Sequence, residues 1–454
     1  MKLSTIDRVQ TATTTRPLGV RELRAAYRAG TLRPRTVVED VLARIAARGD
    51  DAVWITVATA SELRERAQEL ERLDPAEYPL YGVPVAVKDN IDVAGLPTTA
   101  ACPAFAYTPA VDAGSVRRLR EAGAIVVGKT NLDQFATGLN GTRSPYGAPE
   151  SVFGGDLISG GSSSGSAVAV AAGIVPVALG TDTAGSGRVP AALNGIVGLK
   201  PTRGLVGASG VVPACRSLDC VSVFTRDLAD AATVLEVLAG PDPGDPWSRT
   251  AAPVPTGLRL AVPEGLELDA GTAEVFARVT EAAIARADGF VRVDVDPLRE
   301  AGDLLYGGPW VAERLAGLAD FLAGHAADVL PVTRAVIEKG ADFSAVDAFR
   351  GMYRLQELKA WTARLFEAAD VLLLPTVPTT FTRAELAEEP VARNLVLGRY
   401  TQFTNLLDLA AVAVPAGFTR GPDGGRPCGV TLVGPAFSET RLLAAAAAFV
   451  PVEV

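Results

Sequence analysis

The stretch GGSSSGSAVAVAAGIVPVALGTDTAGSGRVPAALNGIVGLKPTRG, residues 160–204, contains two clusters of glycine and hydroxyl residues with apolar sequence between and after them. Glycine lets backbone N–H groups converge on a small volume, and clustered hydroxyls supply hydrogen-bond donors, acceptors and a nucleophile. Residues 160–166 and 180–190 are therefore the first candidates for the reactive part of the protein.

Short β-branched runs alternate with helical or glycine-rich segments on both sides of this stretch. The runs that we expect to form strands are residues 83–87, 125–127, 258–262, 290–295, 371–374 and 412–414. Strands that alternate with helices indicate an α/β fold in which helices cover a largely buried sheet. We expect residues 1–75 to be a helical segment packed on the core, with a capping box at Thr36 and Glu39, and residues 76–454 to be one compact catalytic unit.

The composition restricts the possible catalytic mechanisms, because His325 is the single histidine in 454 residues. One histidine cannot build a multi-histidine metal site, and any histidine-dependent triad would have to use it. The net charge of −9 gives no electrostatic reason to expect nucleic acid or an anionic membrane as a partner. The N-terminus lacks the apolar core of a signal peptide and no apolar run is long enough to span a bilayer, so we expect a cytoplasmic protein. The cysteines are too few and scattered for a disulfide framework, and we expect no metal or cofactor.

The first cluster formally matches G-x-S-x-G at residues 161–165, the nucleophile elbow of α/β-hydrolases. That interpretation needs a strand at residues 154–160, which are a poor strand, and it needs His325 as the base for Ser163. No lysine follows the glycines as a phosphate-binding P-loop requires. The elbow is therefore the weaker hypothesis.

The second cluster suits an oxyanion hole. Small residues over 183–185 leave successive amides free to point one way, and Ser186 would place its hydroxyl beside them. Asp182 and Arg188 could pin the loop, or could be an ordinary surface ion pair. Pro190 fits the first turn of a following helix.

A serine nucleophile needs a base, and a lysine can serve if burial lowers its pKa. The best candidate is Lys88, at the end of the apolar run VPVAV, because lysine is rarely buried without a reason. On the pattern alone, an ordinary surface lysine is the alternative.

Lys88 in GVPVAVKDN, the GGSSSGS cluster and the segment at 180–204 together resemble the amidase signature family, strongly over residues 81–224 and more weakly to about 443. The resemblance implies a large mixed β-sheet flanked by helices on both faces. It implies a Ser-Ser-Lys triad in which Ser186 is the nucleophile, Ser162, usually held in a cis peptide, relays the proton, and Lys88 is the base. It also implies oxyanion-hole amides at Thr183, Ala184, Gly185 and Ser186, and a supporting hydrogen bond from Ser163.

Within that family, residues 133–147 and 210–224 are similar to the allophanate hydrolases. The resemblance implies a small carboxylated urea as substrate, release of ammonia, and a place in urea degradation beside a urea carboxylase. It implies substrate contacts from Tyr306, Arg314, Ser163, Thr137 and Gly138, with Asp182, Arg188 and Asp219 as structural support. The alternative for Arg314 is a solvated helix residue paired with Glu313 or Asp320.

Allophanate hydrolases commonly carry a further C-terminal domain, which we expect to be absent after Val454. Two other functions stay open: the glutaminase subunit of a tRNA-dependent amidotransferase, and a hydrolase of a related amide such as carboxybiuret. A binding protein on an inactive fold is disfavoured by intact Lys88, Ser162 and Ser186. Family members are often dimers, so we expect a homodimer.

Overall fold

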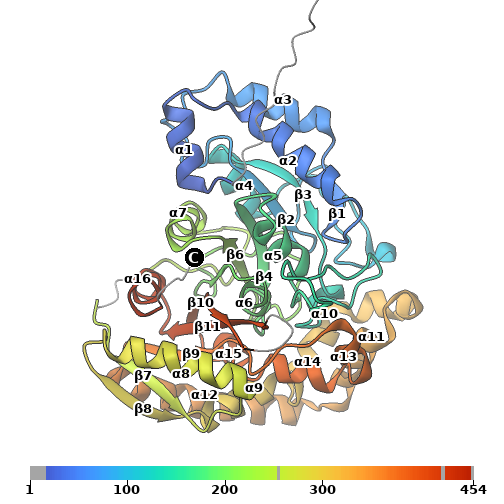
Figure 1. Cartoon of the computed structure of the whole chain (residues 1–454). Helices are drawn as coiled ribbons and strands as arrows, with labels where there is room; N and C mark the ends of the chain where they lie inside the picture. The colour runs from blue at the N-terminus through green and yellow to red at the C-terminus, as the bar shows by residue number, and fades with distance from the viewer. Residues whose placement is uncertain (1–16, 253–255, 421–424, 451–454) are drawn as a thin grey trace, which may run out of the picture.

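The computed structural model describes residues 17–252, 256–420 and 425–450. Within these ranges one mixed sheet forms the centre of the molecule (Figure 1). Its strands are β1 (Trp54–Val57), β2 (Pro84–Lys88), β3 (Ile125–Thr130), β4 (Val177–Asp182), β5 (Val197–Lys200), β6 (Cys220–Thr225), β7 (Leu260–Glu264), β8 (Phe290–Asp294), β9 (Val371–Pro375), β10 (Ala410–Phe418) and β11 (Pro427–Gly434). Their order across the sheet is β1-β3-β2-β4-β6-β5-β10-β11-β9-β7-β8.

Strand direction brings the candidate reactive segments together at the carboxyl ends of three neighbouring strands. β2 lies between β3 and β4 and runs parallel to both, and β7 runs parallel to β8 and β9. The remaining neighbours in the described sheet pair antiparallel. The carboxyl ends of β2, β3 and β4 therefore meet, and these strands end at Lys88, Thr130 and Asp182.

Helices cover the sheet and the loops at its edges. They are α1 (Val20–Arg28), α2 (Pro34–Arg48), α3 (Ala60–Leu70), α4 (Gly114–Glu121), α5 (Ser164–Ala171), α6 (Val189–Leu193), α7 (Leu228–Leu238), α8 (Ala270–Ile284), α9 (Asp296–Tyr306), α10 (Trp310–His325), α11 (Pro331–Glu338), α12 (Ala345–Ala368), α13 (Arg383–Glu388), α14 (Ala392–Leu397), α15 (Phe403–Leu406) and α16 (Glu439–Phe449). Short 3₁₀ turns are η1 (Pro103–Phe105), η2 (Gln134–Ala136), η3 (Ala326–Asp328) and η4 (Lys339–Asp342). None of the helices in the described ranges is both long and apolar enough to cross a membrane.

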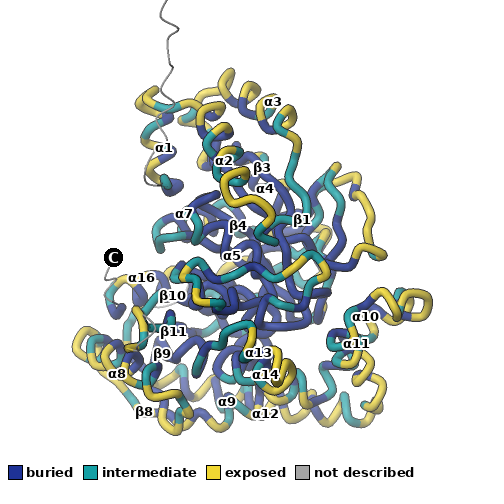
Figure 2. The backbone as a smooth tube through the Cα atoms, turned by 45° about the vertical axis from the view of Figure 1, so that its right-hand side comes forward, coloured by how far each residue is buried: buried dark blue, intermediate teal, exposed yellow. Residues whose placement is uncertain are grey.

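Alternating side chains form a hydrophobic layer on each face of the sheet. On β9, Val371 and Leu373 belong to the cluster that includes residues of α2, α5, α7, α8 and α16. Leu372 and Leu374 belong to the cluster formed with α9, α12 and α15. The central strands β2–β6, β9 and β11 and helix α5 are buried, whereas the edge strand β8 and the outer helices are partly exposed (Figure 2). The predicted α/β fold, with a large mixed sheet flanked by helices on both faces, is confirmed.

The N-terminal segment differs from the prediction in two details. It contains the four-residue strand β1, which pairs with β3 at the edge of the sheet. The sequence on both sides of β1 is charged and helical, so this short strand was not predicted. The Thr36–Glu39 capping box is wrong, because α2 already begins at Pro34 and a proline fits the first turn of a helix. Glu39 instead pairs with Arg64 of α3. The glycine-containing strands β4, β5 and β11, and β6, were also not predicted.

Candidate active site

Lys88 ends β2 and is fully buried. Its Nζ lies 2.8 Å from Ser162 Oγ and 2.7 Å from Thr181 Oγ1. Thr181 belongs to the neighbouring strand β4, and Ser162 lies just before α5, which packs on the same strands. The predicted strand ending in lysine is therefore confirmed, and the alternative of a surface lysine is wrong.

The surroundings of Lys88 favour a neutral amine. Burial lowers the pKa of Lys88 to about 7, although the more distant carboxylates of Asp133, Asp219 and Asp182 act in the opposite direction. The positive charge of Arg314 lowers the pKa further. At neutral pH a substantial fraction of Lys88 is therefore able to accept a proton, which an exposed lysine cannot do.

Ser162 follows a cis peptide bond with Gly161, as the resemblance implied. A Cβ atom at residue 161 would lie 2.6 Å from the backbone nitrogen of Gly141, so only glycine fits there. The backbone carbonyl of Ser162 accepts a hydrogen bond from the Asp133 N–H at 3.0 Å. These contacts hold the serine beside Lys88.

Ser163 makes two hydrogen bonds to the backbone of β4. Its hydroxyl donates to the carbonyl of Thr181 at 3.1 Å and accepts from the same residue's N–H at 3.3 Å. The hydroxyl thus connects α5 to β4, which fits the supporting role, and its contact with substrate stays a prediction. The elbow hypothesis is wrong, because residues 154–160 form turns and isolated bridges where it requires a strand. The half-exposed His325 contacts Asp328 and stacks on Phe321 instead of serving Ser163.

The loop between β4 and α6 carries Ser186, whose side chain is almost fully buried. Arg188 donates to both carboxylate oxygens of Asp182, at 2.8 and 2.9 Å, and both side chains are fully buried. Burial alone would raise the pKa of Asp182, but Arg188 holds it below its usual range. The pair is therefore a buried anchor and not a surface ion pair. Arg188 also bonds Thr401 and Thr404, which ties the loop to the chain before and within α15.

Gly185 departs from the predicted oxyanion hole. Its N–H donates to Asp182 Oδ1 at 2.9 Å, so this amide is committed to the anchor and is not available to a substrate oxygen. The amides of Thr183, Ala184 and Ser186 stay the predicted donors. Sequence could not show this, because the direction of each amide depends on how the loop wraps around the buried carboxylate.

Asp219 supports the same loop from the other side. Its carboxylate accepts from Thr183 Oγ1 at 2.5 Å and from the backbone amides of Ala214 and Cys215 at 2.8 and 3.2 Å. Burial raises the pKa of Asp219 to about 6, against the opposing effect of these hydrogen bonds. Its contacts match the predicted structural support.

A second group of predicted residues converges around Arg314. This arginine, on the second turn of α10, is almost fully buried, and its Nη1 donates to Thr137 Oγ1 at 3.0 Å while Nη2 donates to Tyr306 OH at 3.2 Å. The guanidinium carbon lies 5.1 Å from the centre of the Tyr306 ring. Arg314 Nε has no hydrogen-bond partner among the described residues. The alternative of a solvated Arg314 is therefore wrong.

Two further observations complete the placement of the predicted residues. A Cβ atom on Gly138 would lie 2.5 Å from Asp133 Oδ2, so the glycine makes room for that carboxylate, and its contact with substrate stays a prediction. No hydrogen bond within the described ranges joins Ser186 to Ser162. That link of the triad therefore stays a prediction.

Residues that sequence reasoning missed surround both groups. Asn90 Nδ2 donates to Thr181 Oγ1 at 3.2 Å, and Arg143 Nη1 donates to the Thr137 carbonyl at 3.0 Å. Asp133 accepts from the amides of Gly141 and Arg143. Asn90 lies two residues after Lys88 and Thr181 directly before Asp182, so proximity in sequence was the one available signal.

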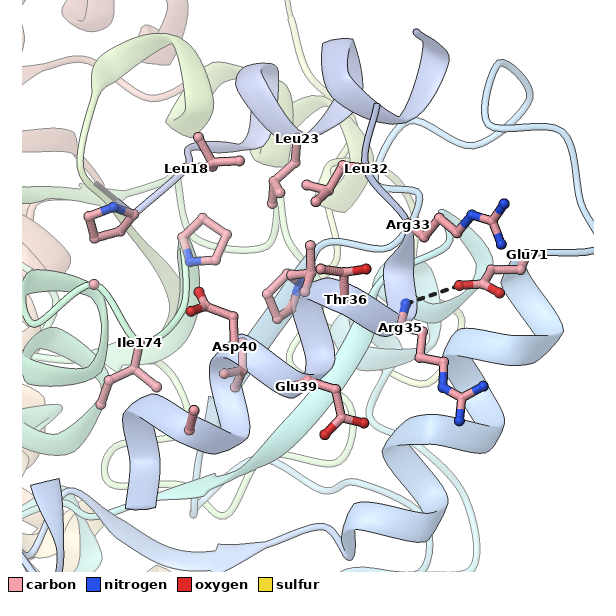
Figure 3. Close-up of a pocket in the computed structure, with 17 residues that line it drawn as sticks. Leu18, Leu23, Leu32, Arg33, Arg35, Thr36, Glu39, Asp40, Glu71 and Ile174 are labelled. Atoms are coloured by element: carbon pink, nitrogen blue, oxygen red, sulfur yellow. Dashed lines mark hydrogen bonds between the residues drawn. The ribbon is translucent and has the colours of Figure 1, made fainter. Parts of the chain in front are cut away.

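A separate cavity of about 570 Å³ lies in the N-terminal part of the molecule (Figure 3). Its walls include Leu18 and Leu23 from the region of α1, Leu32 and Asp40 from the region of α2, and Ile174 after α5. None of the predicted site residues lines it. This cavity is therefore distinct from the site around Lys88.

Fold and site together define the class of protein: the chain belongs to the amidase family, whose family model matches residues 36–443. The predicted family is confirmed, and with it the class of enzyme that acts on amide C–N bonds. The chain is 48% identical over 404 residues to a urea amidolyase of Saccharomyces cerevisiae, covering 87% of this chain and 22% of that protein. It thus spans about a fifth of the length of that relative.

Two further relatives are similar over nearly the whole chain. An allophanate hydrolase structure from Kluyveromyces lactis superposes with a TM-score of 0.88 and 43% identity, covering 95% of this chain and 72% of that one. A glutamyl-tRNA(Gln) amidotransferase subunit of Symbiobacterium thermophilum is 37% identical, covering 95% of this chain and 96% of that protein.

Proposed function

We propose that this chain hydrolyses the terminal amide of allophanate and releases ammonia. The observation that carries the proposal is the fully buried Lys88, whose Nζ lies 2.8 Å from Ser162 Oγ and contacts no carboxylate of the described residues. Higher identity to a urea amidolyase than to an amidotransferase subunit supports allophanate over glutamine.

The substrate carboxylate is expected to bind at Arg314. Its guanidinium is buried, oriented by Thr137 and Tyr306, and keeps an Nε donor without a protein partner among the described residues. A hydrogen bond to a charged group contributes about 1.5–3 kcal/mol, so this anchor would favour a carboxylated urea over a neutral amide.

In the proposed acylation, neutral Lys88 takes a proton from Ser162, and Ser162 takes one from Ser186. The Ser186 Oγ then attacks the terminal carbonyl carbon, and the carbonyl oxygen becomes an oxyanion held by the amides of Thr183, Ala184 and Ser186. The C–N bond breaks as protonated Lys88 returns its proton through Ser162 to the leaving nitrogen. Ammonia departs and leaves an acyl group on Ser186.

Water enters for the second half of the reaction. The same relay removes one proton from water, whose oxygen attacks the acyl carbon, and the proton passes back to Ser186 as the ester bond breaks. One allophanate and one water thus give one dicarboxylate and one ammonia, released as ammonium. Nothing in the proposed relay uses imidazole, which agrees with the position of His325 away from Lys88 and Ser162.

An ammonia-release assay tests the proposal. Purified protein is offered allophanate, malonamate, biuret and glutamine, with Ser186→Ala as the inactive control. We expect turnover to be fastest with allophanate and to fall at least about 10³-fold in the control. If glutamine is turned over fastest, the chain is the glutaminase subunit of an amidotransferase. Carboxybiuret is offered as a fifth substrate, and fastest turnover of it would identify a hydrolase of that related amide.

Three sequence-based predictions accompany this proposal: a homodimer, a cytoplasmic location, and metabolic coupling to a urea carboxylase that supplies the carboxylated urea. The yeast relative is a urea amidolyase, which supports the coupling. Light scattering after size-exclusion chromatography tests the dimer. Ammonia release from urea in the presence of a urea carboxylase, its ATP and bicarbonate tests the coupling.

A further inference from the structure

Thr181 and Asn90 form a chain of buried polar contacts behind Lys88. Thr181 Oγ1 lies 2.7 Å from Lys88 Nζ and 3.2 Å from Asn90 Nδ2, and all three side chains are buried. We propose that Thr181 and Asn90 are positioning residues that hold the Lys88 amine so that its lone pair faces Ser162. The inference rests on the proposed function, in which Lys88 is the base.

The backbone decides the direction of the Asn90 amide. Nδ2 also donates to the carbonyl of Val212 at 3.3 Å, and a carbonyl oxygen can only accept. The nitrogen end of Asn90 therefore faces Thr181, and its N–H occupies one lone pair of the threonine hydroxyl. One lone pair of the Thr181 hydroxyl remains to accept a hydrogen bond from Lys88.

The hydrogen bond to Thr181 affects which way the lone pair of neutral Lys88 points. A protonated lysine has three N–H donors, and two of them are directed at Thr181 and Ser162. When the proton leaves, a lone pair replaces one N–H. In the proposed arrangement Thr181 accepts from Lys88 as it accepts from Asn90, so the N–H toward Thr181 is retained and the lone pair of the neutral amine turns to Ser162. Without Thr181, the flexible side chain could donate to Ser162, which is the wrong direction for a base.

A purely structural role for the two residues predicts a different outcome. If Thr181 and Asn90 only satisfy buried polar groups, their loss weakens folding but leaves the turnover of folded enzyme and its pH dependence unchanged. If they orient the base, kcat falls, KM stays nearly the same, and the pH profile moves. The readouts therefore separate the two roles.

The decisive variant is Thr181→Val, which keeps the shape and removes the hydroxyl. We expect kcat for ammonia release from allophanate to fall about 10–100-fold, with KM within about threefold. The midpoint of kcat/KM against pH is expected to move to lower pH, because the protonated amine loses an acceptor. Thr181→Ser is expected to restore kcat to within about threefold of the unaltered protein.

Thr431→Val is the matched control, because Thr431 is an equally buried threonine on β11 that bonds Thr376 at 2.9 Å and does not contact Lys88. It is expected to keep the kcat and pH midpoint of the unaltered protein. If Thr181→Val does not fold, Asn90→Ala takes its place. We expect Asn90→Ala to lower kcat and to move the pH midpoint in the same directions, but by smaller amounts.

Two results would overturn the inference. The first is a folded Thr181→Val protein, or Asn90→Ala if Thr181→Val does not fold, whose kcat is within threefold of the unaltered protein and whose pH midpoint is unchanged. The second is a Thr181→Ser protein that is as impaired as Thr181→Val. Lys88→Met separates this failure from a failure of the proposed function. If Lys88→Met stays active, the proposed mechanism fails. If it is inactive while Thr181→Val keeps full activity, the positioning inference alone fails.

Discussion

Two fully buried lysines lie on adjacent strands of the sheet and have different partners. Lys129 of β3 is 3.0 Å from the carboxylate of Asp89 and also donates to Thr98 Oγ1 at 2.9 Å. Lys88 of β2 contacts only the hydroxyls of Ser162 and Thr181 among the described residues. Lys129 is in register with Val87, so the two lysines point to opposite faces of the sheet.

The difference shows how the partners of a buried lysine influence its ability to act as a base. Burial lowers the pKa of both amines, but the Asp89 carboxylate opposes that shift at Lys129. Hydroxyls stabilise an ammonium much less than a carboxylate does, and the pKa of Lys88 falls to about 7. A buried lysine is therefore a candidate base only where its contacts are neutral.

Lys88→Met is expected to have the largest effect on activity. Removal of the proposed base is expected to lower kcat/KM for allophanate by about 10³-fold or more, with little loss of stability because no contacting carboxylate loses its partner. Ammonia-release kinetics and urea denaturation measure the two effects. Activity within tenfold of the unaltered protein would contradict the role of Lys88.

Lys129→Met is expected to do the opposite. It leaves the Asp89 carboxylate buried without its cation, which should lower the free energy of unfolding by about 3–5 kcal/mol. The kcat of the folded fraction and its pH midpoint should be retained. Adding Asp89→Asn should recover part of the stability, as measured by a double-mutant cycle in urea. Equal stability of the single mutant and the unaltered protein would show that the pair is not a structural ion pair.

Arg314→Met tests the cation whose charge acts on Lys88. Loss of the anchor is expected to raise KM for allophanate about 10–100-fold, the equivalent of about 1.5–3 kcal/mol. Because the positive charge of Arg314 lowers the pKa of Lys88, the pH midpoint should also rise. Arg354→Met, which removes an exposed arginine of α12, is the control and should change neither value. An unchanged KM would place the substrate carboxylate elsewhere.

Thr181→Asp would give Lys88 a partner like that of Lys129. In the unaltered protein, kcat/KM should increase tenfold per pH unit below about pH 7 and level off above it, because only neutral Lys88 accepts a proton. An adjacent carboxylate favours the protonated amine, so the midpoint should move up by about one unit and activity at pH 7 should fall about fivefold. A midpoint that stays near 7 would mean that another group controls the profile.

His325→Ala is expected to have the smallest effect. The imidazole is half-exposed and bonds Asp328 at 3.0 Å, so its removal should leave kcat/KM within about twofold at every pH between about 6 and 9. Disappearance of the midpoint near 7 in this variant would assign the titration to histidine and would remove the central role from Lys88.

Several parts of the site were predictable from local sequence. A lysine that ends an apolar β-branched run predicts burial, and Lys88 is buried. A Gly-Gly-Pro start followed by a helix predicts that Arg314 lies on the second turn, and α10 has that form. Glycine and hydroxyl clusters marked the two loops that carry Ser162 and Ser186. Each of these signals depends on neighbours within a few residues, which is why the sequence carries it.

Other features were decided by contacts between distant segments. Asp89 follows Lys88 directly, yet its carboxylate pairs with Lys129, because consecutive residues at a strand end face opposite sides. The Val212 carbonyl orients Asn90, and Asp182 withdraws the Gly185 amide from the predicted oxyanion hole.

The sequence by itself determined the α/β class, the resemblance to the amidase family and the side chains proposed to react, because strand patterning and short motifs are local properties. The tertiary structure alone decided which lysine meets a carboxylate and which meets hydroxyls. It also decided which amides remain for a substrate. The physical reason is that the pKa of a buried group and the direction of its hydrogen bonds depend on neighbours that are brought together only when the sheet forms.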